Sequence, residues 1–275
     1  MVKRSNRVIH KPRFISSRDN PLIKQALKIK ARKSKNYLIV EGEHPIEMAR
    51  ASLFKIIRVF FSRKYKNTTF LRRLSMDTEV IETREGIIST LSDTENPQGI
   101  IAIATYETFP LNSLSLKSGL LVICDEIQDP GNLGTIIRTA DAVGADAVII
   151  LPGTCDPFIQ KVIRASAGSI FNIPVVFSDE GEIKVWLKQR GIRLIVTAQR
   201  SNKTIYDLNM KDPVAFVFGN EARGVSEELL CFADEIVNIP ILGKAESLNV
   251  SVAAAVCLYE AVRQRIAVKN DSVLL

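Results

Sequence analysis

From residue 119 onward, short apolar runs alternate with segments of helical periodicity, and this alternation is the feature that most constrains the fold. A short apolar run is typical of a strand buried on both faces, and a helix between two such runs lets the strands pair in parallel. The apolar runs are Gly119–Asp125, Ala147–Leu151, Pro174–Phe177, Leu194–Ala198, Val214–Phe218 and Ile236–Ile239. The helical segments are Leu133–Val143, Phe158–Ala165, Ile183–Arg190 and Leu248–Ile266. We therefore predict a mostly parallel sheet with helices on both faces.

A shorter alternation of the same kind precedes residue 106. Its strand-like runs are Tyr37–Glu41, Ile56–Ser62, Val80–Glu82 and Gly99–Thr105, and its helical segments are Glu43–Ser52 and Glu85–Leu91. These patterns predict a small α/β domain over residues 1–105. Residues 106–118 contain Pro110 and three serines without strong periodicity, so we expect a linker there and a second domain over residues 119–275.

The net charge of +7 is concentrated at one end of the chain. Residues 1–35 hold 12 Lys and Arg against one acidic residue, whereas the remainder holds 25 basic and 29 acidic residues. Asn20 and Pro21 form a typical helix start, and basic side chains surround the apolar stripe that follows. These side chains, which we expect to bind the phosphates of a polyanionic partner, are Lys24, Lys28, Lys30, Arg32 and Lys33. A solubilising tail is the alternative interpretation of this basic arm.

Several classes of protein are disfavoured by what the sequence lacks. The longest apolar stretch is too short to cross a membrane, and the basic N-terminus has no apolar signal segment, so a cytoplasmic protein is expected. The spacing of the four cysteines matches neither a zinc site nor a redox pair, and only two histidines are present. No metal site is therefore expected. Dinucleotide-binding and P-loop glycine motifs do not occur either.

Three loops that follow predicted strands have a composition that core packing does not require. They are Asp129–Gly134, Gly219–Gly224 and Leu242–Asn249, each with glycine and polar residues. In open α/β sheets, ligands bind at the carboxyl ends of the strands. Any one of these loops alone would be read as a turn, so their joint order and spacing carry the information.

Taken together, these loops resemble the SpoU class of RNA ribose 2′-O-methyltransferases in the SPOUT superfamily. The matching segments are Asp129–Gly144, Phe218–Ser226, Ile239–Ile241 and Ser247–Ala253. The resemblance implies a C-terminal sheet domain with a deep trefoil knot, and S-adenosylmethionine as cofactor. It places the cofactor against the second and third loops, at Gly219, Asn220, Gly224, Ile239, Ile241 and Leu248.

The resemblance also implies a substrate. The N-terminal half looks like the RNA-binding domain often attached to this class, on Phe14–Ser17 and Tyr37–Gly42. Lys161–Gly168 and Ile173–Val175 resemble the branch that acts on ribosomal RNA, here expected to be 23S. Lys161 and Arg164, three apart on one helix face, are further candidates for RNA phosphate contact, or else form a solvated face.

Arg138 is the residue expected to act on the ribose hydroxyl, either as a base or by stabilising the developing alkoxide. Its structural alternative is a salt bridge to Asp141 or Asp125. Asn132, Glu221, Ser247 and Asn249 are expected to line the same pocket. Asn132 has the alternative role of capping the helix that carries Arg138, and Ser247 or Asn249 that of capping the final helix.

The final helix is apolar on most sides, since from Val250 to Val262 only Ser251 and Glu260 are polar. Because members of the SpoU class are generally dimeric, this apolar helix predicts a homodimer through the C-terminal domain. The alternative is that the helix is buried within a monomer. Two other functions stay open, a transfer-RNA methyltransferase and a noncatalytic RNA-binding or ribosome-assembly protein. The target nucleotide and any role in antibiotic resistance are not determined by the sequence.

Overall fold

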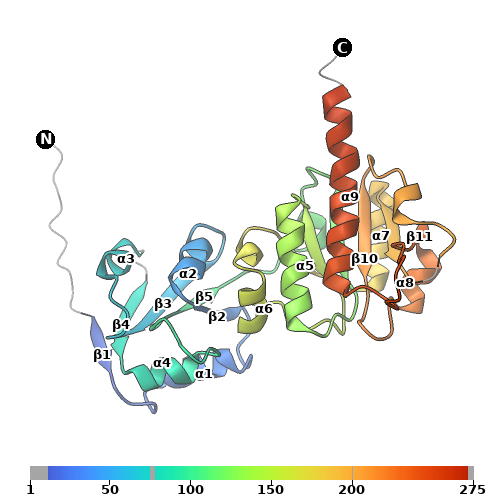
Figure 1. Cartoon of the computed structure of the whole chain (residues 1–275). Helices are drawn as coiled ribbons and strands as arrows, with labels where there is room; N and C mark the ends of the chain where they lie inside the picture. The colour runs from blue at the N-terminus through green and yellow to red at the C-terminus, as the bar shows by residue number, and fades with distance from the viewer. Residues whose placement is uncertain (1–11, 75–77, 200, 272–275) are drawn as a thin grey trace, which may run out of the picture. The chain divides into compact units, whose positions relative to one another are not determined.

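The computed structural model describes residues 12–74, 78–199 and 201–271, with side chains described up to residue 266 (Figure 1). Residues 1–11 of the predicted basic arm therefore lie outside the described residues. The chain divides into two compact units after Tyr106. No described helix is long and apolar enough to span a bilayer.

The N-terminal unit is built on a five-stranded mixed sheet with the strand order β1-β4-β3-β5-β2. β5 runs antiparallel to β2 and β3, whereas β4 is parallel to β1 and β3. Figure 1 shows α1 and α4 on one side of this sheet and α2 on the other. The strands are β1 (Arg13–Ile15), β2 (Tyr37–Glu41), β3 (Lys55–Ser62), β4 (Glu79–Thr83) and β5 (Ile100–Thr105). The helices are α1 (Pro21–Lys30), α2 (Glu43–Arg50), α3 (Thr68–Arg73) and α4 (Glu85–Leu91).

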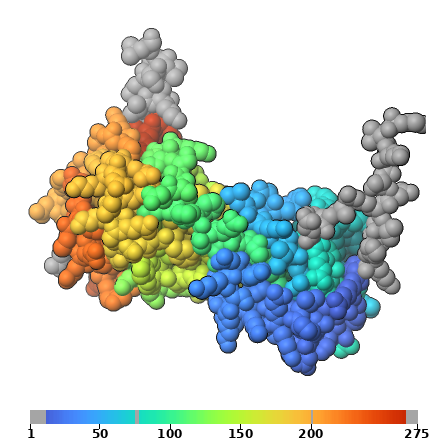
Figure 2. Space-filling model, turned by 180° about the vertical axis from the view of Figure 1, so that it is seen from behind, coloured from blue at the N-terminus to red at the C-terminus, as the bar shows by residue number. Residues whose placement is uncertain are grey.

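Helix α1 begins as its sequence predicts, because the Asn20 side chain accepts a hydrogen bond from the Leu22 amide at 3.0 Å. Ile23, Ala26 and Ile29 face the core, and the outer side of α1 lies at the surface, where the dark-blue atoms of Figure 2 show it. The helix ends at Lys30, and Arg32 has a φ of +55°. Placing Arg32 and Lys33 on this helix was therefore wrong.

The C-terminal unit has a six-stranded sheet in which all strands are parallel, in the order β11-β9-β10-β6-β7-β8. The strands are β6 (Leu120–Cys124), β7 (Ala147–Ile150), β8 (Val175–Phe177), β9 (Arg193–Thr197), β10 (Val214–Phe218) and β11 (Glu235–Val237). The helices are α5 (Pro130–Ala142), α6 (Gln160–Ala165), α7 (Glu180–Arg190), α8 (Glu227–Phe232) and α9 (Val250–Asp271). This arrangement confirms the predicted parallel sheet with helices on both faces.

Two helical layers bury the sheet of the C-terminal unit. Ile183 and Trp186 of α7 and Leu229 of α8 belong to the core cluster on one face. Leu111 and Leu114, from the segment expected to be a linker, are buried in the same cluster, so this segment packs on the second unit. Helices α5 and α9 lie side by side over the other face (Figure 1).

The C-terminal unit covers helix α9 on only one of its sides. Ala254, Cys257, Leu258 and Ala261 are fully buried, whereas Val252, Tyr259 and Ile266 are 50–54% exposed. Near its C-terminal end, the Arg265 guanidinium donates to the carbonyls of Met210 at 2.8 Å and Ser118 at 2.8 Å. These bonds fix α9 along the sheet, so that its N-terminus lies at the carboxyl ends of the strands.

Candidate active site

The first predicted loop leads directly into α5, and Asp129 rather than Asn132 caps this helix. The Asp129 carboxylate accepts a hydrogen bond from the Asn132 amide at 2.9 Å, and Pro130 occupies the first helical position. The pKa of Asp129 lies below its usual value, chiefly because of that bond. The structural role considered for Asn132 was therefore wrong. Its side chain lies inside the first helical turn and is available to the other loops.

Glu221, in the second loop, holds the start of the first. Its carboxylate accepts hydrogen bonds from the backbone amides of Gln128 and Asp129, both at 3.2 Å, and from the side-chain amide of Asn132 at 2.9 Å. Partial burial acts to raise the pKa of Glu221, but these hydrogen bonds outweigh it and the pKa lies below its usual value. Glu221 is therefore an ionised carboxylate whose orientation is set by these three hydrogen bonds.

The third loop joins the same cluster through Asn249. Its side-chain amide donates to the Asn132 side-chain oxygen at 2.9 Å, and its own oxygen accepts from the Ser251 amide at 2.9 Å. Asn249 thus caps α9, which starts two residues later than predicted. Ser247 is exposed and makes no hydrogen bond within the described part of the chain. The structure brings together Asn132, Glu221 and Asn249, one from each loop.

The second loop is a tight turn in which backbone lies against backbone. A Cβ atom on Gly219 would lie only 2.4 Å from backbone atoms of Gly224 and Val225, so no other residue fits there. Asn220 accepts from the amides of Ala222 and Arg223 at 3.0 and 3.1 Å, and donates to the Glu126 carbonyl at 3.0 Å. Gly224 completes the turn with a φ of +78°. The deep knot that the resemblance implies stays a prediction.

Two acidic residues after β6, which are not among the predicted site residues, also hold this second loop. Asp125 is buried and accepts from the Ser226 amide at 2.7 Å, and Glu126 pairs with Arg223. Burial raises the pKa of Asp125, against the bond from Ser226. Within the described residues, the other Asp125 oxygen and the Ser226 hydroxyl are buried without a partner. A polar residue at the last position of a buried strand was the signal for Asp125.

Arg138 lies on the same helix as Asn132, six residues or about 9 Å further along its axis. It is exposed, and among the described residues it forms neither a hydrogen bond nor an ion pair. The salt bridges to Asp141 or Asp125 considered as alternatives are therefore not formed. Among the described residues, the Arg138 guanidinium therefore has no partner that would compete with a bound substrate.

The residues expected to contact the cofactor have the chemistry that an adenosyl group with a charged amino-acid tail requires. Ile241 and Leu248 are partly exposed at 37% and 38%, and Leu242 is 98% exposed, so the third loop offers apolar side chains. The second loop offers backbone brought close by Gly219 and Gly224. Ile239 lies beyond the end of β11, half-buried. These residues fit S-adenosylmethionine, although their contacts with it stay predictions.

Helix α6 places two cations near the first loop. Gly134 of α5 allows α6 to pack closely against α5, because a Cβ atom at Gly134 would lie 2.4 Å from the Cβ atom of Ala165 in α6. Lys161 pairs with Asp129 at 3.7 Å, and Arg164 is exposed. Both stay candidates for RNA contact.

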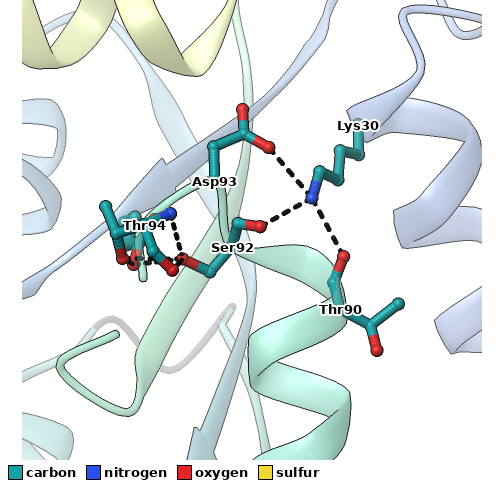
Figure 3. Close-up of polar contacts among 6 residues, drawn as sticks. Lys30, Thr90, Ser92, Asp93 and Thr94 are labelled. Carbon is teal, nitrogen blue, oxygen red and sulfur yellow. Dashed lines mark hydrogen bonds and ion pairs between the residues drawn. The ribbon is translucent and has the colours of Figure 1, made fainter. Parts of the chain in front are cut away.

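The five basic residues predicted to bind RNA have different environments. Figure 3 shows the Lys30 ammonium bonded to the carbonyls of Thr90 at 3.0 Å and Ser92 at 2.6 Å, with Asp93 beside it at 2.9 Å. Arg32 donates to the Tyr37 carbonyl at 2.6 Å. These two cations hold the N-terminal unit together. The three exposed cations are Lys24, Lys28 and Lys33, of which Lys24 pairs with Asp19 at 3.0 Å.

Comparison with known proteins identifies the family of both units. Residues 119–259 match the SpoU rRNA Methylase family, and residues 20–102 match the MRM3-like substrate binding domain. The chain is 35% identical over 248 residues to the 23S rRNA (guanosine(2553)-2'-O)-methyltransferase RlmP of Bacillus subtilis, covering 89% of this chain and 97% of that protein. It is 31% identical to the 23S rRNA (uridine(2479)-2'-O)-methyltransferase of Streptomyces viridochromogenes, covering 83% of each.

A solved structure resembles most of the chain. The SpoU methyltransferase AviRb from Streptomyces viridochromogenes, in complex with the cofactor AdoMet, matches with a TM-score of 0.83 and 29% identity, over 90% of this chain and 98% of that one. Fold and site define an RNA 2′-O-methyltransferase that uses S-adenosylmethionine. The chain belongs to the SpoU rRNA methylase family.

Proposed function

We propose that this protein methylates the 2′-hydroxyl of one ribose in 23S ribosomal RNA. The observation that carries this proposal is the bonding of Asn132 to both Glu221 and Asn249, because it joins all three loops at one point near the start of α5, the helix that also carries Arg138. The relatives named above act on 23S RNA, which supports this substrate. The cytoplasmic location expected from the sequence stays a prediction.

The chemistry requires a weakly acidic hydroxyl to become a nucleophile. S-adenosylmethionine, when bound, supplies a methyl group on a positively charged sulfur. Arginine is a cation in proteins and a poor base, so we assign Arg138 the role of placing positive charge beside the ribose oxygen as that oxygen loses its proton to solvent. Glu221 and Asn132 do not transfer that proton, because their hydrogen bonds are used between the loops. They hold the first and third loops in the geometry that the reaction needs.

We also propose a homodimer through α9. Val252, Tyr259 and Ile266 follow one another at intervals of seven residues and form an exposed apolar stripe on this helix. Ala254, on another side of the helix, is buried against its own unit. A charge at Ala254 would therefore test folding, and one at Val252 tests association.

The proposal is tested by incubating the purified protein with labelled S-adenosylmethionine and either 23S RNA or transfer RNA. Label transferred to 23S RNA, with the modified ribose resistant to alkaline cleavage, is the expected result. Transfer to transfer RNA alone would favour the alternative substrate. Cofactor binding without transfer to either RNA would favour a noncatalytic role.

A further inference from the structure

Strand β6 is followed by a buried acid at a position where the core of the sheet would accept another apolar side chain. All five residues of β6 are buried, and Leu121 and Ile123 belong to the core cluster that α7 and α8 cover. The Asp125 amide continues the pairing with β10 by donating to the Phe218 carbonyl at 2.9 Å. Since side chains alternate between the faces of a sheet, the Asp125 carboxyl lies on the same face as Ile123, toward α8.

Burial makes this carboxyl unfavourable for the stability of the fold. Asp125 is 1% exposed, and no Lys or Arg among the described residues pairs with it. A buried acid lowers stability unless its hydrogen bonds compensate. In the described part of the chain, the bond that its carboxylate accepts comes from the Ser226 amide at 2.7 Å. The contribution of Asp125 therefore lies in what that bond holds.

The bond to Ser226 lies where the second loop closes on itself. The Gly224 amide donates to the Asn220 carbonyl at 2.9 Å, and Gly219 lies against the backbone of Gly224. Ser226 comes two residues after this closure and directly before α8, and its own side chain does not cap that helix. Asp125 therefore attaches the closed base of the second loop to the end of β6.

The second loop has a separate attachment on the side of the Asn132 cluster. There the Glu221 carboxylate accepts its three hydrogen bonds from the first loop. Gly219 and Gly224, which are predicted to contact the cofactor, lie instead at the base that Asp125 holds. Loss of the Asp125 bond should therefore disturb the cofactor contacts and leave the Asn132 cluster in place.

We infer that Asp125 is a positioning residue for the cofactor, which sets the affinity for S-adenosylmethionine through Ser226 without touching the cofactor itself. The inference rests on the proposed function in that it takes the second loop as the place where the cofactor binds. It does not depend on which RNA is methylated. Asp125 acts through the oxygen that accepts from Ser226, so an amide oxygen at the same place should replace it.

The test measures binding of S-adenosylmethionine to the full-length protein by calorimetry and methyl transfer on the same preparations. Asp125→Ala should raise the Kd and the KM for the cofactor about tenfold, or about 1.4 kcal/mol. The loss is limited because Asn220 and Arg223 keep their bonds to Glu126. At saturating cofactor, kcat should stay within about threefold of the wild type, which a general loss of folded protein would not produce.

Two further variants separate the bond from the fold. Asp125→Asn should recover most of the affinity, because its amide oxygen can still accept from Ser226. Asp125→Ala leaves the Ser226 amide unpaired, so the same change is also made together with Ser226→Pro, which removes that amide. The φ of −58° at Ser226 suits proline. The double variant should show the same tenfold loss of affinity.

Asp146→Ala is the matched control, at the opposite end of β6. The Asp146 carboxylate accepts from the backbone amides of Lys117 at 2.9 Å and Gly119 at 2.7 Å. This variant should lose stability and keep the wild-type affinity for the cofactor.

Wild-type cofactor affinity in Asp125→Ala or in the double variant would overturn the inference. An equal loss of affinity in Asp146→Ala, or a loss in Asp125→Asn as large as that in Asp125→Ala, would overturn it too. An unfolded double variant would do the same, since the fold itself would then require Asp125. If the wild type binds S-adenosylmethionine and methylates no RNA, the proposed function fails, whereas the binding measurements still decide the role of Asp125.

Discussion

Replacing Asn132 with alanine removes a side chain that contacts both other loops. It eliminates the donor at 2.9 Å from Glu221 and the acceptor at 2.9 Å from Asn249. A hydrogen bond to a charged group contributes about 1.5–3 kcal/mol and a neutral one about 0.5–1.5 kcal/mol. Glu221 keeps two backbone donors and Asn249 is exposed, so water can replace the lost partners. The lower end of the sum, about 2 kcal/mol, is the expected cost.

This loss of interaction free energy lowers the fraction of molecules in which the three loops are assembled. About 2 kcal/mol corresponds to a roughly 30-fold decrease in kcat/KM if only the assembled site reacts. The helix itself keeps its Asp129 cap, so the variant should stay folded in circular dichroism. Steady-state methyl transfer and denaturant unfolding, measured on the same samples, separate the two effects.

Asn172→Ala is the matched control for this prediction. Asn172 donates to Asp141 at 3.2 Å, so it makes the same kind of bond to a carboxylate near the other end of α5. We expect a similar small loss of stability and wild-type activity. Equal loss of activity in both variants, or an Asn132→Ala variant within about threefold of the wild type, would refute the assignment of Asn132.

Three further predictions concern RNA binding, association and pH. The triple change of Lys24, Lys28 and Lys33 to alanine should weaken RNA binding and flatten its salt dependence, while cofactor affinity stays unchanged. If filter binding shows an unaltered salt slope, the RNA binds elsewhere on the protein. Val252→Glu should give folded monomers in sedimentation at micromolar concentration, and a wild type that is itself monomeric would contradict the dimer. The lowered pKa of Glu221 means that its contribution to stability is present above its usual value of about 4.5 and is lost as the pH falls below it. Glu221→Gln should therefore show a smaller decrease of unfolding free energy in acid than the wild type does, and identical pH profiles would refute this role.

Most elements could be predicted from the sequence, and three short ones could not. The six strands of the parallel sheet were all predicted, and the clearest of them, β6, β7 and β10, consist entirely of buried apolar residues. β1 has three residues and α3 and α8 have six each, which is too short for a period to be recognised. The direction of β5 also depends on pairing with strands distant in the sequence.

The composition of the site was predictable, but its internal contacts were not. Both Asp129 and Asn132 are good capping residues, and Pro130 between them was the sign that the helix starts at Asp129. Lys30 carries the same charge as Lys28, yet it bonds to carbonyls 60 and 62 residues away. Such contacts follow from the packing of α1 near α4, which no local pattern contains. Asn132 meets Asn249 across 117 residues for the same reason.

The role proposed for Arg138, acting on a ribose hydroxyl of 23S RNA, can be tested in cells. Ribose methylation in 23S RNA is mapped in cells that lack this protein and carry either the wild-type gene or Arg138→Ala. We expect one ribose to be methylated with the wild type and unmethylated with Arg138→Ala, while the purified variant still binds S-adenosylmethionine within a few-fold of the wild type. Full methylation with Arg138→Ala, or a 23S methylation pattern that is the same with and without the protein, would contradict the account.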